Sequence, residues 1–155
     1  MATFTPVIAV HASVALIVIL LGPLQILRPR RDRAHRILGR TFVVLMVLTS
    51  TTSFFIHPDG FTWLHGLAIV NLLTLGLAVG GILKGNVEMH KRAMIGAYAS
   101  TLIAFIFASA MPDRLIQTTL RSEPATILLT SAGLFALIAA WSTGVIWRLG
   151  SRQVR

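Results

Sequence analysis

Histidine is the residue type in this chain best suited to chemistry, because an imidazole can bind a metal or carry a proton near neutral pH. The sequence has five histidines and no cysteine, so thiolate metal sites and iron–sulfur clusters are excluded. His57 lies in a short polar stretch, whereas the other four each lie near the start of a long apolar run. These four candidate ligands are His11, His35, His65 and His90.

The spacing of the four histidines is repeated along the chain. His65 follows His11 by 54 positions, and His90 follows His35 by 55. Because consecutive membrane helices run in opposite directions, this spacing predicts an outer pair, His11 with His65, and an inner pair, His35 with His90. In a four-helix bundle each pair would face across the interior, as the two axial ligands of a six-coordinate haem b do. A single metal site made of all four is excluded by their different depths.

Two glycines predict space for a cofactor near the inner pair. Gly22 lies 11 residues after His11, and Gly76 lies 11 residues after His65. Eleven residues make about three helical turns, or roughly 16 Å. Each glycine is therefore expected on the face of its histidine, near the depth of the inner pair. Ordinary packing of small residues between helices is the alternative explanation.

Basic side chains flank the inner pair. Haem propionates require cationic partners, and the residues that could supply them are Arg36, Arg40, Lys91 and Arg92. The alternative for each is to extend toward lipid phosphate groups. The outer pair has no such cluster, so a haem there would depend on water, Trp63, His57 or the outer loops.

The elements that must position these residues are transmembrane helices. Apolar residues make up 55% of the 155-residue chain, charged residues 12%, and the mean hydropathy is +0.78, whereas a soluble domain is usually about 25% charged. Five apolar runs have about the 20 residues that a helix needs to cross a bilayer; they are residues 6–27, 37–56, 63–83, 93–111 and 125–147. The sequence therefore predicts an all-α, multi-pass protein with residues 1–155 as a single transmembrane domain, its first four helices forming a bundle.

The positions of the charges predict the orientation of these helices. Twelve of the 14 basic residues lie between the first and second runs, at the start of the second run (Arg40), between the third and fourth, or after the fifth. Basic residues stay on the cytoplasmic side, so the N-terminus is expected outside and the C-terminus inside. Topology and contact with anionic lipid explain the net charge of +9, and no nucleic-acid partner is expected.

Three short blocks of sequence contain the four candidate ligands or follow them closely. The blocks are His11-x10-Gly22-Pro23-x-Gln25, His35-Arg36-x2-Gly39-Arg40 and His90-x3-Met94. Together they resemble a bacterial family of uncharacterised predicted membrane proteins, a domain of unknown function. The resemblance covers the first four runs, with Ala93 where the family pattern has an aromatic residue. It implies a multi-pass protein of the bacterial inner membrane and implies no activity.

The arrangement of the four histidines is also similar to the di-haem cytochrome b-561 class, whose four-helix core holds two bis-histidine haems on opposite sides. This second resemblance is one of architecture and ligand placement. It implies electron transfer across the membrane from an ascorbate-like or quinol donor. A dehydrogenase or a second copy of the chain is the candidate protein partner.

These observations predict a membrane b-type cytochrome with one or two haems, which would be a transmembrane oxidoreductase or an electron-transfer subunit. It would move electrons across the membrane, or between quinone and a partner. The alternative is a haem-free structural or accessory subunit, or a small-molecule transporter. Zinc or copper sites would need three or four ligands each, and no nucleophile–base–acid constellation is visible. The fifth run has no histidine and is expected at the periphery.

Overall fold

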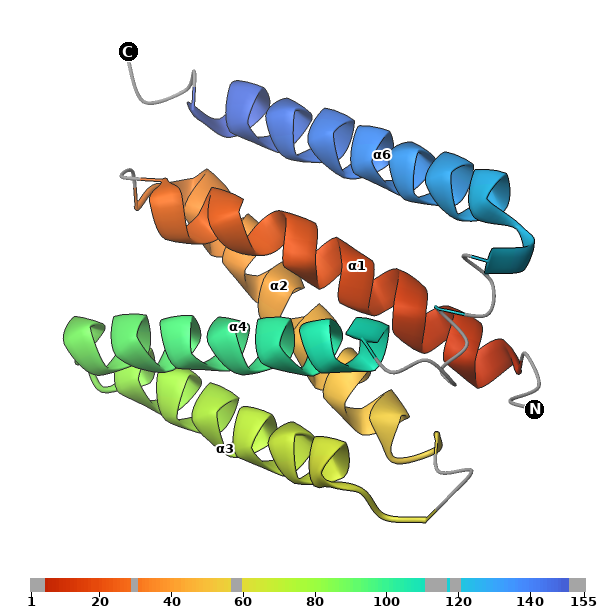
Figure 1. Ribbon diagram of the computed structural model, residues 1–155. Helices are drawn as coiled ribbons and strands as arrows, with labels where there is room; N and C mark the ends of the chain where they lie inside the picture. Colours follow the sequence, from red (N-terminus) through yellow and green to blue (C-terminus); the bar gives the residue numbers. More distant parts are fainter. Residues whose placement is uncertain (1–4, 29–30, 57–59, 111–116, 118–120, 151–155) are drawn as a thin grey trace.

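The computed structural model describes residues 5–28, 31–56, 60–110, 117 and 121–150 of the chain. This part contains five long helices and no strand. The helices are α1 (Pro6–Leu27), α2 (Arg33–Ser53), α3 (Trp63–Leu83), α4 (Val87–Ala110) and α6 (Pro124–Gly150) (Figure 1). The predicted all-α class is confirmed.

Four of these helices, α1, α3, α4 and α6, are long and apolar enough to cross a membrane. The bounds of α1 and α3 agree with the predicted runs, whereas α2 and α4 begin before the apolar residues do. Polar residues extend both helices, because Asp32 caps the first turn of α2 and Asn86 accepts a hydrogen bond from the start of α4. The early starts place His35 and His90 within helices. The first turns of α2 are basic, so the second predicted run as a membrane span stays a prediction, and so does the orientation.

Helices α1 to α4 form a ring. α1 packs against α2 and α4, and α3 packs against the same two helices. Within the described residues, the backbones of α1 and α3 do not approach each other, nor do those of α2 and α4. Each of these two pairs is therefore diagonal, which is the arrangement that the repeated spacing predicts. α6 packs outside the ring against α1 and α2, at the expected peripheral position (Figure 1).

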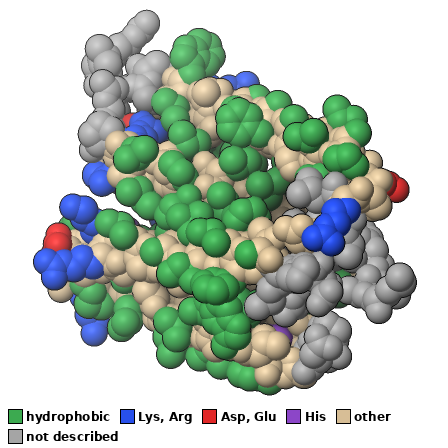
Figure 2. All heavy atoms as spheres, in the orientation of Figure 1, with side chains coloured by type: hydrophobic (Ala, Val, Ile, Leu, Met, Phe, Trp, Pro, Cys, Tyr) green, Lys and Arg blue, Asp and Glu red, His purple; other side chains and the backbone are tan. Residues whose placement is uncertain are grey.

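The middle of the molecule is an apolar core. Its buried members come from all four helices of the ring and from α6: Val18, Leu21, Phe42, Met46, Leu75, Ala97 and Ile138. Many other large apolar side chains are exposed on the outer faces of the helices, and Figure 2 shows them spread across the molecule, with most Lys and Arg side chains gathered at one end. An apolar exterior suits contact with hydrocarbon, where no hydrophobic driving force holds the helices together.

A buried polar group joins three helices toward the end of the ring where α1 and α3 begin. Asn71 of α3 donates from Nδ2 to Ser50 Oγ of α2 at 2.8 Å, and Ser100 Oγ of α4 lies 3.3 Å from Asn71 Oδ1. Asn71 and Ser50 are both buried. Because side-chain hydrogen bonds contribute to helix association in lipid, Asn71 is a central contact of the bundle.

Candidate cofactor site

The four candidate ligands lie at two opposite ends of the ring. α1 and α3 begin at one end, and α2 and α4 begin at the other (Figure 1). His11 and His65 therefore lie at one end, and His35 and His90 lie at the opposite end. This is the sorting into two pairs that the spacing predicts. His57 lies outside the described residues.

His90 has the ring state of a metal ligand. Its Nδ1 lies 2.9 Å from the carbonyl oxygen of Ala78 on α3. A carbonyl can only accept, so Nδ1 carries the hydrogen and Nε2 of the neutral ring keeps its lone pair. Metal-binding histidines are typically held in this way. His35 lies at the same end of the ring on α2, the helix diagonal to α4. The fold thus places the inner pair at one end of the bundle, on diagonal helices.

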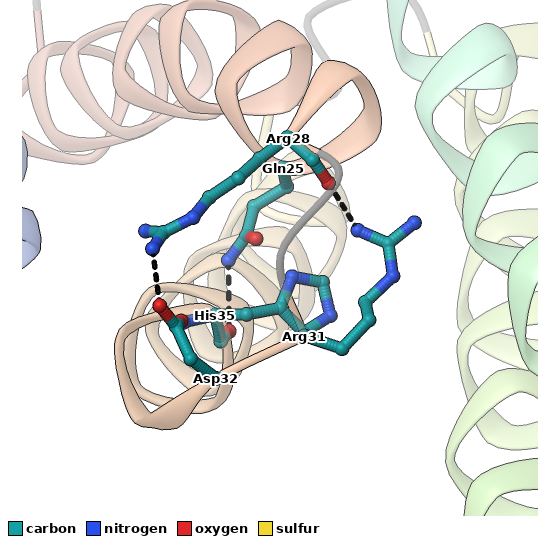
Figure 3. A network of polar contacts seen from close by, with 5 residues as sticks. All are labelled: Gln25, Arg28, Arg31, Asp32 and His35. Carbon is teal, nitrogen blue, oxygen red and sulfur yellow. Dashed lines mark hydrogen bonds and ion pairs between the residues drawn. The ribbon is translucent and has the colours of Figure 1, made fainter. Parts of the chain in front are cut away.

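The first turn of α2 fixes the backbone of His35. Asp32 is the N-cap of this helix, and its Oδ1 accepts a hydrogen bond from the His35 N–H at 2.9 Å. Arg28 Nη2 donates to Asp32 Oδ2, so the end of α1 is tied to the start of α2 (Figure 3). The hydrogen bond from the His35 N–H holds the pKa of the Asp32 carboxyl below its usual value; burial opposes this effect, and the Arg28 charge supports it.

Gln25 of α1 reaches the same turn of α2. Its side chain is buried, and its Nε2 donates to the His35 carbonyl oxygen at 3.2 Å. Gly39 lies beside this amide, since a Cβ at that position would be in ordinary contact with Gln25 Nε2 at 3.4 Å. Within the described residues, Gln25 Oε1 and His35 Nδ1 are both buried without a hydrogen-bond partner. The first and second sequence blocks therefore meet at the inner pair.

The Gly22-Pro23 part of the first block forms a socket for Tyr98 of α4. Pro23 has no N–H, so the Ile19 carbonyl lacks its usual helical partner, and Tyr98 Oη donates to that carbonyl at 2.9 Å. A Cβ at Gly22 would lie 2.1 Å from the Tyr98 ring, whereas a Cβ at Gly76 would meet no atom within 4 Å. Haem contact at these glycines stays a prediction, and the neighbour of Gly22 in the structure is Tyr98.

The arginines near the inner pair differ in their surroundings. Arg36 and Arg40 are exposed, and Arg92 pairs with Glu88 at 2.6 Å, both side chains being largely exposed. Arg28 was not among the expected residues, yet its side chain is only 11% exposed and its Nη1 is buried without a partner in the described part of the chain. The N-cap residue four positions after Arg28 is the sequence signal that could have indicated this burial.

His11 of the outer pair makes a hydrogen bond with α2. Its Nδ1 lies 3.0 Å from Thr52 Oγ1. The Thr52 hydroxyl is also within hydrogen-bond distance of the carbonyl oxygens of Leu48 and Thr49. When its single hydrogen serves one of these carbonyls, His11 donates from Nδ1 and Nε2 of a neutral ring is unprotonated.

His65 has a structural role that conflicts with ligation. Its Nδ1 accepts a hydrogen bond from the Thr62 N–H at 2.9 Å and forms part of the capping box of α3. A neutral ring that accepts at Nδ1 carries its hydrogen on Nε2. Phe61 stacks on the imidazole with ring centroids 5.0 Å apart. In this state neither ring nitrogen of His65 has a lone pair available for iron. The outer pair therefore suits a haem less well than the inner pair.

Clusters suited to a non-haem metal do not occur in the part of the chain that the structure describes: no three His, Asp or Glu side chains converge there. Two histidines are too few for a zinc or copper site. A haem iron needs only two axial ligands, because the porphyrin supplies the other four. In number of ligands, the inner pair suits a haem and does not suit a bare ion.

The chain was compared with known protein families. The family model described as Predicted membrane protein (DUF2306) matches residues 8–143. The chain belongs to this family. The matched range includes all three sequence blocks, so the first of the two resemblances is confirmed. No curated protein and no solved structure matches the chain significantly.

Within this DUF2306 chain, the blocks act at the ends of helices. The first block supplies Gln25 to the inner end, the second supplies His35 and Gly39, and the third supplies His90. The family description establishes a predicted membrane protein. The similarity to the cytochrome b-561 class stays a prediction.

Proposed function

We propose that the chain is a membrane b-type cytochrome that holds haem b between His35 and His90. The observation that supports this most directly is the hydrogen bond from His90 Nδ1 to the Ala78 carbonyl oxygen, which leaves Nε2 free to bind iron. His35 lies at the same end of the ring on the diagonal helix, and within the described residues its Nδ1 is buried without a hydrogen-bond partner. Among the hydrogen bonds of the described residues, none uses the Nε2 atom of His35 or of His90.

When bound, the haem would supply reversible one-electron transfer. His35 and His90 would hold the iron, and Arg28, Arg36 and Arg40 would offer cations to the propionates, in addition to the predicted Arg92. The buried core next to this end would exclude water, a factor that controls the potential of a metal site. A quinol or another small reductant would be the donor, and a dehydrogenase or a second copy of the chain would be the protein partner.

The number of haems in this proposal is one. A second haem at the outer pair would require His65 to give up the hydrogen bond with Thr62 that caps α3. The proposal therefore places electron exchange at the inner end of the bundle. Transport across the whole membrane, in the orientation with the N-terminus outside a bacterial inner membrane, would need the second site.

One observation favours the alternative, a haem-free structural or accessory subunit. His65 shows that a histidine at a helix start in this chain can serve as a cap, since its Nδ1 accepts the Thr62 N–H. If all four histidines had such roles, no ligand would remain. The inner pair differs because neither imidazole caps its own helix.

The test is the visible spectrum of the full chain, purified in detergent after expression with added haem precursor. We expect a Soret band, sharp α and β bands on reduction, and about one haem per chain, as for a six-coordinate cytochrome. His35→Ala and His90→Ala should each abolish these bands, whereas the matched change His65→Ala should leave them in place. A folded, colourless wild-type preparation would overturn the proposal.

A further inference from the structure

Two unsatisfied groups lie beside each other at the inner end of the bundle. Gln25 Oε1 and His35 Nδ1 are both buried and without a partner in the described residues. Figure 3 shows the Gln25 amide lying against the His35 backbone, with its oxygen on the side of the imidazole ring. One atom can only accept, and the other can carry a hydrogen. Burial without a hydrogen bond is costly for each, so their pairing would satisfy both.

We infer that Gln25 is a positioning residue for His35: its Oε1 accepts the Nδ1–H of the imidazole and thereby presents Nε2 toward His90. The Gln25 amide is already oriented, because its Nε2 donates to the His35 carbonyl oxygen at 3.2 Å. With the nitrogen held there, the oxygen is directed away from that carbonyl. Rotation of the imidazole about its terminal side-chain bond would then form the second hydrogen bond.

Among the described side chains drawn in Figure 3, no other acceptor is free for this role. Arg28 and Arg31 carry donors only. Asp32 Oδ1 accepts the His35 N–H, and Asp32 Oδ2 accepts from Arg28. Among the five residues of this network (Figure 3), Gln25 Oε1 is therefore the acceptor that remains.

The pairing makes the two inner histidines alike. His90 donates from Nδ1 to a carbonyl oxygen, and His35 would donate from Nδ1 to an amide oxygen. Both rings would then carry their hydrogen on Nδ1 and keep the Nε2 lone pair. The consequence for haem rests on the proposed function, whereas the tautomer of His35 is a property of the chain itself.

The first test is nitrogen NMR of the haem-free full chain, labelled with ¹⁵N-histidine and kept above pH 8, where histidine is neutral (its usual pKa is about 6.5). The His35 signals are assigned from their loss in His35→Ala. We expect the Nδ1–H tautomer in the wild type and in Gln25→Glu, which keeps an acceptor. Gln25→Leu should shift His35 to the Nε2–H tautomer. Thr74→Val, which removes a distant side-chain hydrogen bond on α3, should leave it unchanged.

The second test is titration of each variant with haemin. Removing a hydrogen-bond partner of a metal ligand typically weakens metal binding about 10–100-fold, and we expect a loss of that size in Gln25→Leu. Gln25→Glu should bind haemin, with a lower reduction potential because a carboxylate strengthens the donation from Nδ1. Thr74→Val should retain the wild-type affinity and potential.

The inference is overturned if wild-type His35 is the Nε2–H tautomer, or if Gln25→Leu keeps the wild-type tautomer. The wild-type measurement alone decides the matter if Gln25→Leu does not fold. If no variant and no wild-type protein binds haemin, the proposed function fails, and the NMR result still tests the role of Gln25.

Discussion

At the scale of single residues, Tyr98 offers the sharpest test of the structure. Its hydroxyl donates to the Ile19 carbonyl that Pro23 leaves without a partner. Tyr98→Phe keeps the ring in its socket and removes only the donor, so a part-buried carbonyl is left unsatisfied. We expect the free energy of unfolding to fall by about 1–3 kcal/mol, measured by denaturant unfolding in detergent.

The matched control for this prediction uses Pro23. Pro23→Ala restores a backbone N–H four residues after Ile19, which can donate to the same carbonyl. In the Pro23→Ala background, Tyr98→Phe should therefore cost much less than it does in the wild type. An equal loss in both backgrounds would show that the hydroxyl does not serve the Ile19 carbonyl.

Asp32 predicts how the stability of this end depends on pH. Its folded-state pKa is lowered, first by the hydrogen bond from the His35 N–H, so its contribution is fully present above the unfolded pKa of about 3.9. That contribution is lost as the pH falls through the lower folded pKa. Unfolding measured from pH 6 to pH 2 should show this loss in the wild type and a flatter acid limb in Asp32→Asn.

Glu88 provides the control for the acid limb, because its carboxylate lies in an exposed pair with Arg92. Glu88→Gln should leave the acid limb close to that of the wild type. If Glu88→Gln flattened the acid limb as much as Asp32→Asn does, the acid limb would not report specifically on the N-cap of α2.

Some properties of single residues could be predicted from the sequence, and others could not. The two histidine pairs follow from helix direction and spacing, which are local properties of the chain. The burial of Arg28 and the contact of Tyr98 with Gly22 depend on side chains that different helices bring together. The role of His65 as a cap was missed because its Nδ1 competes for a local N–H, whereas spacing carries no information on which ring nitrogen is used.

At the scale of helices, the Asn71 contact predicts how strongly α2, α3 and α4 are tied together. Asn71→Leu removes its hydrogen bond to Ser50 and the contact with Ser100. Interhelical hydrogen bonds in membranes average about 0.6 kcal/mol, with a maximum of about 1.7, so we expect a loss of roughly 1 kcal/mol in detergent unfolding. Adding Ser50→Ala should then cost little, because its partner is already gone. If Ser50→Ala cost as much stability in the Asn71→Leu background as it does in the wild type, the two side chains would not share a contact.

Helix bounds were predictable where the sequence changes abruptly from polar to apolar, as at α1 and α3. They were less predictable for α2 and α4, whose first turns are polar. Hydropathy indicates where a helix can cross lipid, whereas capping residues such as Asp32 decide where the helix begins. An apolar run therefore marks the part of a helix that can lie in lipid, and the helix itself can begin several residues earlier.

At the scale of the whole molecule, the orientation can be tested because the chain has no cysteine. Single cysteines are introduced at two exposed positions on opposite ends, as Phe61→Cys and Lys84→Cys. If the basic end is cytoplasmic, a maleimide that cannot cross the membrane should label Phe61→Cys in intact cells and Lys84→Cys only after permeabilisation. The reverse pattern would mean that the N-terminus is inside.

The ring of helices has a consequence for biosynthesis. Its most extensive packing joins chain neighbours, α1 with α2 and α3 with α4, so each half can assemble as a hairpin while it leaves the ribosome. The bonds from Asn71 to Ser50 and from Tyr98 to Ile19 connect one hairpin to the other. They can form only after both hairpins have been inserted. The inner end is likewise complete only then, because the first hairpin supplies Gln25, Asp32 and His35 and the second supplies His90.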